Sequence, residues 1–199
     1  TIERTVNSGL NWTEFSTGFR NTNYSMDFEG TDHGWTCGSQ GTVGITTDGG
    51  NNWSRVQAGG ANDYLNQIDF ANLNTGFCAG EKGLVLKSIN GGNNWSQINS
   101  GVTAGLYSLQ FLNENTGWVC GDSGTLIKTT NGGDNWILVQ RQNGVLYTSI
   151  DFPSSNVGYI CGTLGVILKS TNGGLNWSQQ VSGTGTSFLS QSFYNENYG

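Results

Sequence analysis

Short apolar stretches alternate with polar residues along the whole chain, and clusters of Gly, Asn, Asp and Ser separate them. In the clearest stretches an apolar residue stands two positions before a phenylalanine, at Met26/Phe28, Ile68/Phe70, Leu109/Phe111 and Ile150/Phe152. Residues two apart lie on the same face of a β-strand, so this spacing predicts strands with one buried face. No stretch has a helical period, and the sequence therefore predicts an all-β fold.

Each of these strands opens a unit of four predicted strands. A turn follows the first strand, and the second strand begins with an aromatic residue: Trp35, Phe77, Trp118 or Tyr159. The second strand ends in a Gly-x-x-Gly turn, at Gly38/Gly41, Gly80/Gly83, Gly121/Gly124 and Gly162/Gly165. The third strand, for example 125–129 or 166–170, leads into another turn, and a tryptophan opens the fourth strand.

This last turn is the most specific feature of the repeat. The pattern Ser/Thr-x-Asx-x-Gly-x-x-Trp, in which Asx is Asp or Asn, occurs five times. In such a turn the Asx side chain caps backbone amides, the hydroxyl bonds back across the turn, and Gly supplies a positive φ. The tryptophan adds a large apolar anchor. The residues are Thr5, Asn7, Gly9, Trp12; Thr46, Asp48, Gly50, Trp53; Ser88, Asn90, Gly92, Trp95; Thr129, Asn131, Gly133, Trp136; and Ser170, Asn172, Gly174, Trp177.

The spacing of the five tryptophans predicts the architecture. They lie 41, 42, 41 and 41 residues apart, and a period of about 40–45 residues with four strands per unit is typical of a β-propeller. We expect one propeller domain, or a portion of one from a larger polypeptide. Its four complete blades are 16–56, 57–98, 99–139 and 140–180. A fifth blade is split between the termini, with its third and fourth strands in 1–15 and its first strand in 181–199.

The stretch from Gly117 to Trp136 carries a resemblance to a known family. It reads Gly-Trp-x-Cys-Gly-x-x-Gly-x-x-x-Lys-Thr-Thr-Asn-Gly-Gly-x-x-Trp, and it resembles the Asp-box repeat of bacterial neuraminidases (BNR repeat). The form is similar to that of photosystem II assembly-factor-like propellers and of secreted bacterial proteins with a type IX sorting tail. The resemblance covers the whole chain and implies a propeller. It leaves the function open, because Asp boxes occur in sialidases, xyloglucan hydrolases, sortilin-like receptors and non-enzymatic surface proteins.

Composition narrows the choice of partners. The formal charge of −6, with only eight Lys and Arg among 199 residues, argues against nucleic acid, whose phosphates need a basic face. No apolar run is long enough to span a bilayer, so we expect no membrane insertion. No cofactor is indicated.

The four cysteines, Cys37, Cys78, Cys120 and Cys161, occupy one slot of the repeat to within a residue. Equivalent slots in neighbouring blades lie on sheets about 10 Å apart, which is too far for a disulfide. We therefore expect small buried thiols. Cys78 is shifted by one residue, so it points to the opposite sheet face and is the thiol that can face a neighbour's.

No constellation for catalysis stands out. The single histidine, His33, lies in a predicted turn and is interpreted as a surface residue. The arginines Arg4, Arg20, Arg55 and Arg141 fall in unrelated slots of the repeat, unlike the triad of a sialidase. Asp48 has Asn at the equivalent positions of the other blades, so the turns are interpreted as hydrogen-bonding devices. We expect no catalytic residue and no metal there.

Two sets of positions remain as candidate sites. The first precedes the first-strand phenylalanines and faces the propeller channel. It either forms a polar ring for waters or a cation, or bonds neighbouring backbone amides; its members are Asp27, Asp69, Gln110 and Asp151. The second is a candidate ligand face on the Gly-x-x-Gly turns and the loops between blades, where repeat proteins place variable residues. It comprises Phe19, Arg20, Asp63, Tyr64, Glu81, Lys82, Tyr107, Asp122, Arg141 and Tyr147.

These observations favour a non-enzymatic propeller that is secreted or displayed at a bacterial cell surface, as an interaction or structural module for a protein or glycan. One alternative is a portion of a carbohydrate-active enzyme, either a xyloglucan hydrolase or sialidase-like. Another is a glycan-binding propeller without catalysis. A glycosidase would show two carboxylates across a cleft, and a lectin would show one aromatic and polar pocket per blade.

Overall fold

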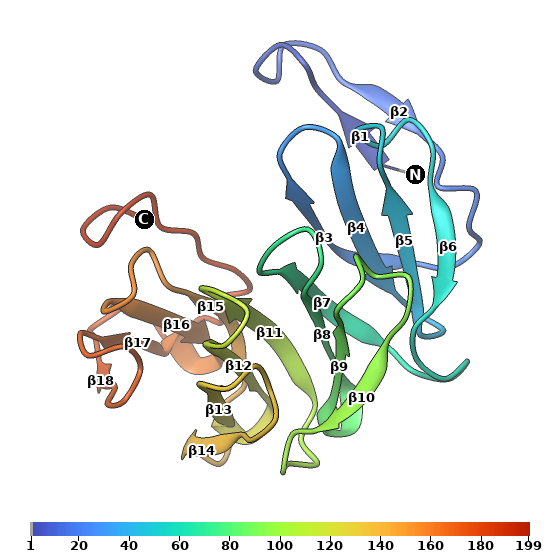
Figure 1. Ribbon diagram of the computed structural model, residues 1–199. Helices are drawn as coiled ribbons and strands as arrows, with labels where there is room; N and C mark the ends of the chain where they lie inside the picture. Colours follow the sequence, from blue (N-terminus) through green and yellow to red (C-terminus); the bar gives the residue numbers. More distant parts are fainter. Residues whose placement is uncertain (1) are drawn as a thin grey trace.

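The computed structural model describes residues 2–199. Four antiparallel sheets of four strands fan out around a common centre (Figure 1), and we number them blades 1 to 4 in chain order. Blade 1 holds β3 (Asn23–Glu29), β4 (His33–Gly38), β5 (Thr42–Thr46) and β6 (Ser54–Gln57). Blade 2 holds β7 (Leu65–Phe70), β8 (Gly76–Gly80), β9 (Leu84–Ser88) and β10 (Ser96–Asn99). Blade 3 holds β11 (Leu106–Phe111), β12 (Gly117–Gly121), β13 (Leu126–Thr129) and β14 (Ile137–Gln140). Blade 4 holds β15 (Tyr147–Asp151), β16 (Gly158–Gly162), β17 (Ile167–Ser170) and β18 (Ser178–Gln179).

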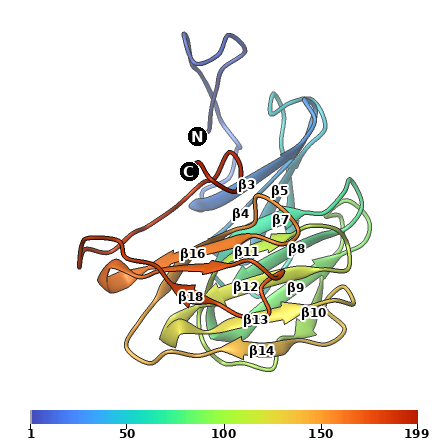
Figure 2. The same cartoon turned by 90° about the vertical axis from the view of Figure 1, so that its left-hand side faces the viewer.

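Within every blade the strands pair in chain order. The first strands β3, β7, β11 and β15 lie innermost and the fourth strands outermost (Figure 1), and the sheets stack face to face (Figure 2). Short 3₁₀ turns join the second and third strands of the last three blades: η1 (Glu81–Gly83), η2 (Asp122–Gly124) and η3 (Thr163–Gly165). The predicted all-β fold with four-stranded propeller blades is confirmed.

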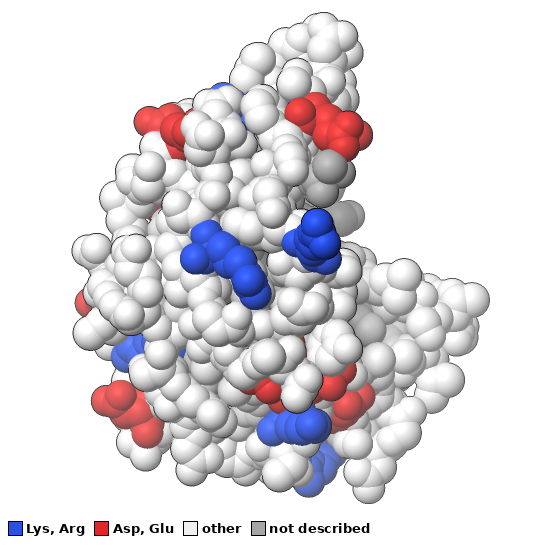
Figure 3. Space-filling model, turned by 90° about the vertical axis from the view of Figure 1, so that its right-hand side faces the viewer, with Lys and Arg blue, Asp and Glu red and all other residues white. Residues whose placement is uncertain are grey.

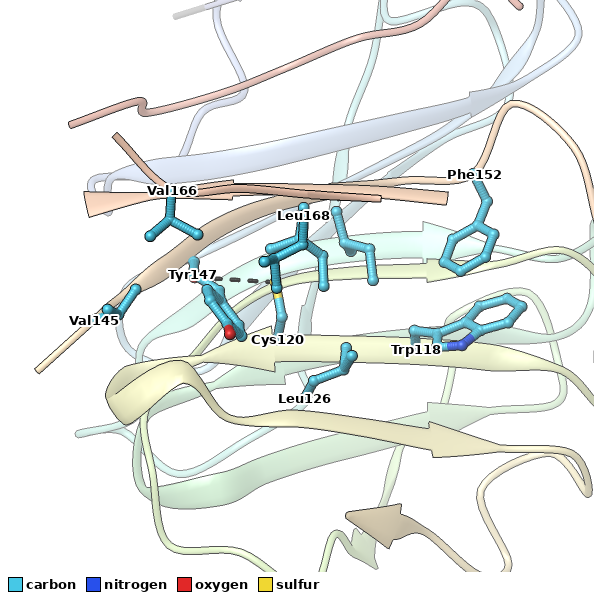
Figure 4. Close-up of a cluster of buried hydrophobic side chains, with 10 residues drawn as sticks. Trp118, Cys120, Leu126, Val145, Tyr147, Phe152, Val166 and Leu168 are labelled. Carbon is cyan, nitrogen blue, oxygen red and sulfur yellow. Dashed lines mark hydrogen bonds between the residues drawn. The ribbon is translucent and has the colours of Figure 1, made fainter. Parts of the chain in front are cut away.

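The hydrophobic core consists of separate clusters between adjacent blades. In each interface the aromatic residue of a second strand stacks on the first-strand phenylalanine of the next blade. Trp35 lies on Phe70 with 3.6 Å between ring centroids, and Phe70 meets the turn residue Trp95 edge-on at 5.9 Å. Such pairs contribute about 0.5–1.5 kcal/mol beyond the burial of their area. Figure 4 shows the cluster between blades 3 and 4, in which Trp118 faces Phe152 at 3.8 Å.

The stacked phenylalanines explain the glycine that begins most second strands. A Cβ atom on Gly117 would come within 2.6 Å of the Phe111 ring, and the same contact recurs at the equivalent glycines. The ring lies flat across the backbone of the neighbouring strand, so any side chain there would displace it. The Gly-aromatic dipeptide is therefore the sequence signature of this stack.

The tryptophans that end the Ser/Thr-x-Asx-x-Gly-x-x-Trp turns are less buried than their predicted role as anchors suggests. Trp136 is only partly buried, and Trp12 is 58% exposed. The fully buried tryptophans are Trp35 and Trp118 of the second strands, each 1% exposed. A second strand lies between two neighbouring sheets, whereas the turn before the fourth strand lies near the outer edge of its blade.

The two terminal segments do not join into one blade. Strands β1 (Ile2–Arg4) and β2 (Thr13–Phe15) form a separate two-stranded sheet beside blade 1, and Thr1, the first residue of that predicted strand, lies outside the described residues. No strand is found in 181–199, where the sequence predicts one. The N- and C-terminal ends lie at opposite ends of the arc of blades (Figure 1).

The segment 181–199 still makes the contacts of a first strand toward blade 4. Phe193 stacks on Tyr159 at 3.8 Å, and its amide donates to Asp151 Oδ2. A β-strand also needs a hydrogen-bonded partner in its own sheet, and none of the described residues provides one. At the other end, Phe28 has no second-strand aromatic stacked on it among residues 2–199. It lines an apolar cleft of about 510 Å³ with Ile2, Met26 and Trp53.

Candidate functional site

One edge of the propeller is built from the Gly-x-x-Gly turns and the loops that lead into the first strands. We call this edge the loop rim; it comprises residues 16–22, 38–41, 58–64, 80–83, 100–105, 121–124, 141–146 and 162–165. Backbone hydrogen bonds tie each turn to the neighbouring loop, for example from the amide of Gly83 to the carbonyl of Ala104 (2.7 Å) and from Gly124 to Val145 (2.6 Å). Because the backbone bonds are satisfied between blades, the rim is a rigid support for variable side chains.

Each turn on the rim presents one side chain outward from a left-handed residue. These are Gln40, Lys82, Ser123 and Leu164, with φ between 54° and 62°. The left-handed conformation is unfavourable for residues with a Cβ atom, and here the glycine that follows is packed closely against the neighbouring loop. Leu164 is 65% exposed. The four turns thus display a polar, a basic, a small and an apolar side chain at equivalent positions.

Most residues of the predicted ligand face do lie on the loop rim. Arg20, Tyr64, Glu81, Lys82 and Arg141 are exposed, and Phe19, Asp63, Tyr107 and Asp122 are partly buried. Phe19 packs over Gly44 and Asp63 accepts a hydrogen bond from the amide of Gly60, so these two shape their own loops.

Tyr147 was wrongly placed on this face. Its side chain is fully buried in the cluster between blades 3 and 4, and Gln140 Nε2 donates to its hydroxyl at 2.6 Å. Burial raises the pKa of Tyr147 to about 12. Leu65 and Leu106, both fully buried, hold the equivalent positions in blades 2 and 3, which identifies Tyr147 as a core residue.

Three clefts open on the rim, two of which meet at Gln40 in blade 1. The first, about 490 Å³, lies between blades 1 and 2 and is flanked by Tyr24 and Tyr64, whose ring centroids are 6.4 Å apart. The second, about 320 Å³, is lined by Arg20 and Arg55. The third, about 520 Å³, lies between blades 3 and 4 beside Asp122 and Leu164. The rim therefore offers aromatic, cationic and mixed subsites within one surface.

Charged side chains are sparse. Figure 3 shows the side of the molecule that carries β6 and β10, where a few basic and acidic side chains are scattered among uncharged ones and two basic side chains lie near each other. Near η2 the hydroxyl of Tyr107 donates to Asp122 Oδ2 at 3.2 Å. Burial, together with the charge of Asp122, raises the pKa of Tyr107, which keeps the phenol protonated as a donor.

The channel residues bond backbone amides of the next blade, as one of the two hypotheses held. Asp27 Oδ2 accepts from the amide of Phe70 at 2.7 Å, and Asp69 Oδ2 accepts from Phe111 at 2.6 Å. Gln110 Oε1 does the same for Phe152 and Asp151 Oδ2 for Phe193, both at 2.6 Å. Desolvation raises the pKa of Asp27 and Asp151, and raises that of Asp69 to about 7. These groups join the blades.

The five Ser/Thr-x-Asx-x-Gly-x-x-Trp turns, which we call stapled turns, have the predicted hydrogen bonds. In each, the Ser or Thr hydroxyl oxygen accepts from the amide of the pattern's glycine at 2.9–3.0 Å. The same hydroxyl donates to the Asx side chain. Asp48 additionally accepts from the backbone and side chain of Asn52. These bonds lower the pKa of Asp48 to about 2, so the carboxylate is ionised at neutral pH.

The cysteines are buried free thiols, as predicted. Cys37 and Cys78 lie in the same cluster between blades 1 and 2, which confirms that the shifted Cys78 faces its neighbour. Burial, and secondarily the Cys37 thiol, raises the pKa of Cys78 well above its usual range. Within residues 2–199 no group of three or more His, Cys, Asp or Glu side chains is suitably placed for a metal ion. In the same range no helix is long and apolar enough to cross a membrane.

One repeated contact was missed in the sequence. Lys87 Nζ and Lys128 Nζ reach into the next blade and donate to the carbonyls of Gly132 and Gly173, both at 2.7 Å. Each ammonium also lies over the second-strand aromatic ring of its own blade, at 5.6 Å from Phe77 and 5.0 Å from Trp118. The sequence contains a signal, because the third strands of blades 2 to 4 carry lysine at one position of the repeat, but the carbonyl that each bound lysine contacts is 45 residues away.

Comparison with known proteins places this architecture. A family model described as photosynthesis system II assembly factor YCF48 matches residues 4–105 and 97–184, and a search of curated proteins gave no match. A structure of YCF48 bound to D1 peptide is 17% identical with a TM-score of 0.54, over 88% of this chain and 86% of that one. YCF48 from Cyanidioschyzon merolae is 16% identical with a TM-score of 0.59, over 93% and 94%.

An ancestral GH74 enzyme is 20% identical with a TM-score of 0.69 over 85% of this chain. The match covers only 25% of the enzyme's chain. At these identities the likeness to solved structures shows the propeller fold alone.

Proposed function

The chain belongs to the family of the photosystem II assembly factor YCF48, and from this premise we propose that it is a non-enzymatic propeller that binds an extended segment of a partner protein on its loop rim. Three clefts on the loop rim carry this proposal, of which two lie between adjacent blades and the arginine-lined one lies within blade 1. A peptide that follows the rim would contact Tyr24 and Tyr64 between blades 1 and 2. It would also reach the cleft lined by Arg20 and Arg55 of blade 1. A member of the family bound to a peptide supports a protein ligand over other classes.

The physical basis is a rim whose turns are held by backbone hydrogen bonds to the neighbouring loops. Binding to a preorganised surface loses little conformational entropy on the protein side. Tyrosine and arginine are the residues that most often dominate the energy of protein interfaces. The exposed Tyr24 and Tyr64, at 47% and 44% exposure, are therefore the expected anchors of the contact.

The proposal is tested by selecting a displayed peptide library against the immobilised chain and by using the D1 peptide as a first defined probe. Tyr64→Ala should weaken binding of selected peptides about tenfold or more. Leu138→Ala is the matched control, because Leu138 is similarly exposed, at 50%, but lies on β14 at the outer edge. If peptides bound both variants equally, or if the chain enriched glycans from an array and no peptide, the proposal would be wrong.

We further propose that the chain works outside the cell or at a bacterial cell surface. Its support is compositional: only 11% of residues are charged, and the self-stapled turns suit a durable exposed scaffold. Protease treatment of intact source cells should degrade the protein, whereas an internal marker should persist. Complete protection until lysis would contradict this placement.

A further inference from the structure

A cation bridges neighbouring sheets in three places, once from the terminal sheet to blade 1 and twice between blades. Arg4 Nη1 donates to the carbonyl of Gly49 at 2.8 Å, and Lys87 and Lys128 make the equivalent bonds to the following blades. In the two lysine cases the ammonium lies between an aromatic ring and a turn carbonyl. Such a site combines a cation–π contact with a hydrogen bond and favours a cation that can donate, such as an alkylammonium group.

The interface between blades 1 and 2 lacks this cation. Ile45 stands opposite Trp35 in the strand register, where Lys87 stands opposite Phe77 and Lys128 opposite Trp118. The carbonyl of Gly91 accepts instead from Trp35 Nε1 at 2.9 Å. A cleft of about 530 Å³ opens here, lined among others by Trp35, Ile45, Asp48 and Gly91. We call it the Asp48 cleft.

The walls of the Asp48 cleft favour a positive charge. Asp48 is the only carboxylate among its lining residues, and no Lys or Arg lines it; His33 is the only other ionisable group. Side chains of Asn52, Asn74 and Asn90 add polar groups around the opening. At the matching turns of blades 2 to 4 the Asp is replaced by Asn. The interface between blades 1 and 2, which lacks an internal cation, is thus the one beside the acidic turn of Asp48.

The carbonyl of Gly91 is also open to exchange. In the interface between blades 3 and 4, Lys128 occupies the matching carbonyl of Gly173 while the indole Nε1 of Trp118 has no hydrogen-bond partner. The fold therefore accommodates either donor at this position. An incoming ammonium can replace Trp35 Nε1 as the donor to the carbonyl of Gly91. This would reproduce the arrangement of Lys128 and Gly173.

We propose that the Asp48 cleft binds a lysine side chain of a partner protein, in the place that Lys87 and Lys128 fill within the chain. This deepens the proposed function, since it assigns the partner a basic residue. The partner's ammonium lies near Asp48 and the carbonyl of Gly91, and its methylene groups cover Ile45. The cleft is separate from the loop rim, so the partner contacts two surfaces.

The probe is Nα-acetyl-lysine methylamide, titrated into ¹⁵N-labelled protein while the indole N–H signals of the tryptophans are followed by NMR. The Trp35 signal, assigned with Trp35→Phe, should shift saturably, and those of the other tryptophans should not. The norleucine analogue, which has the same four side-chain carbons but no ammonium group, should leave the Trp35 signal unchanged. An equal shift with norleucine would overturn the proposal.

Two variants locate the contact. Asp48→Asn should raise the Kd about two- to fivefold, as expected for loss of a partly exposed ion pair, whereas Asp134→Asn makes the same change in net charge outside the cleft and should have no effect. Ile45→Lys fills the site from within and should abolish binding. Both substitutions copy residues present in sister blades, and unchanged thermal unfolding verifies the fold. If Ile45→Lys bound the lysine probe as well as the native chain does, the proposed cleft site would be refuted. The effect of Tyr64→Ala on peptide binding at the loop rim tests the proposed function separately and does not depend on that result.

Discussion

Asp69 makes the stability of the propeller depend on pH. Its Oδ2 atom accepts the amide of Phe111 at 2.6 Å across the gap between blades 2 and 3. Desolvation, and secondarily the charge of Asp27, raises its pKa from 3.8 to about 7. The folded state therefore holds this proton more tightly than the unfolded chain does. The free energy of unfolding should fall as pH rises from about 4 to 7 and should change little from this source above pH 7.

The size of the effect follows from the shift. About three pKa units at 1.36 kcal/mol each give roughly 4 kcal/mol as an upper limit. Water entry and relaxation around the ionised carboxylate reduce this, so we expect about 1–4 kcal/mol. Asp69→Asn removes the charge and keeps an acceptor oxygen, as Gln110 shows by accepting from Phe152 at the next interface. The variant should be more stable than the native chain at pH 7.5, and the difference should vanish toward pH 4.

Urea unfolding followed by tryptophan fluorescence at several pH values between 4 and 8.5 measures this. Gln110→Glu is the reverse test, because it places a carboxyl group at the equivalent position and should add a pH dependence of the same sign. Asp134→Asn, at an exposed turn, controls for the change in net charge. The reasoning fails if Asp69→Asn keeps the native pH dependence or loses stability at pH 7.5.

Three further outcomes are expected. Trp118→Ala should cost about 3–5 kcal/mol of unfolding free energy, and Trp136→Ala roughly half as much, because only Trp118 is fully buried; equal urea midpoints would contradict this. Gly117→Ala should cost about 1–3 kcal/mol because its Cβ meets the Phe111 ring, whereas Gly185→Ala has open space and should leave the melting temperature unchanged. A thiol reagent should find no fast-reacting cysteine in the folded protein and four after unfolding without reductant; fewer than four would indicate a disulfide.

The sequence by itself determined the repeat and its turns. The stapled turn closes within eight residues, from Thr129 to Trp136 for example, and its hydrogen bonds join atoms no more than four residues apart. Such local chemistry is readable because every participant is adjacent in the chain. The period of the tryptophans then fixed the number of strands per blade and the propeller class.

Only the tertiary structure decided how the blades are joined and which rim residues are exposed. Asp27 bonds an amide 43 residues away, and Lys87 reaches a carbonyl 45 residues away. Neither partner is marked by a local pattern, because a first-strand amide or a turn carbonyl is present in every repeat. Tyr147 shows the same limit, since its place in a variable loop suggested a surface residue until the packing of blade 4 on blade 3 buried it. The repeat pattern lies within one blade, whereas burial and the hydrogen bonds of these charged side chains form between two blades.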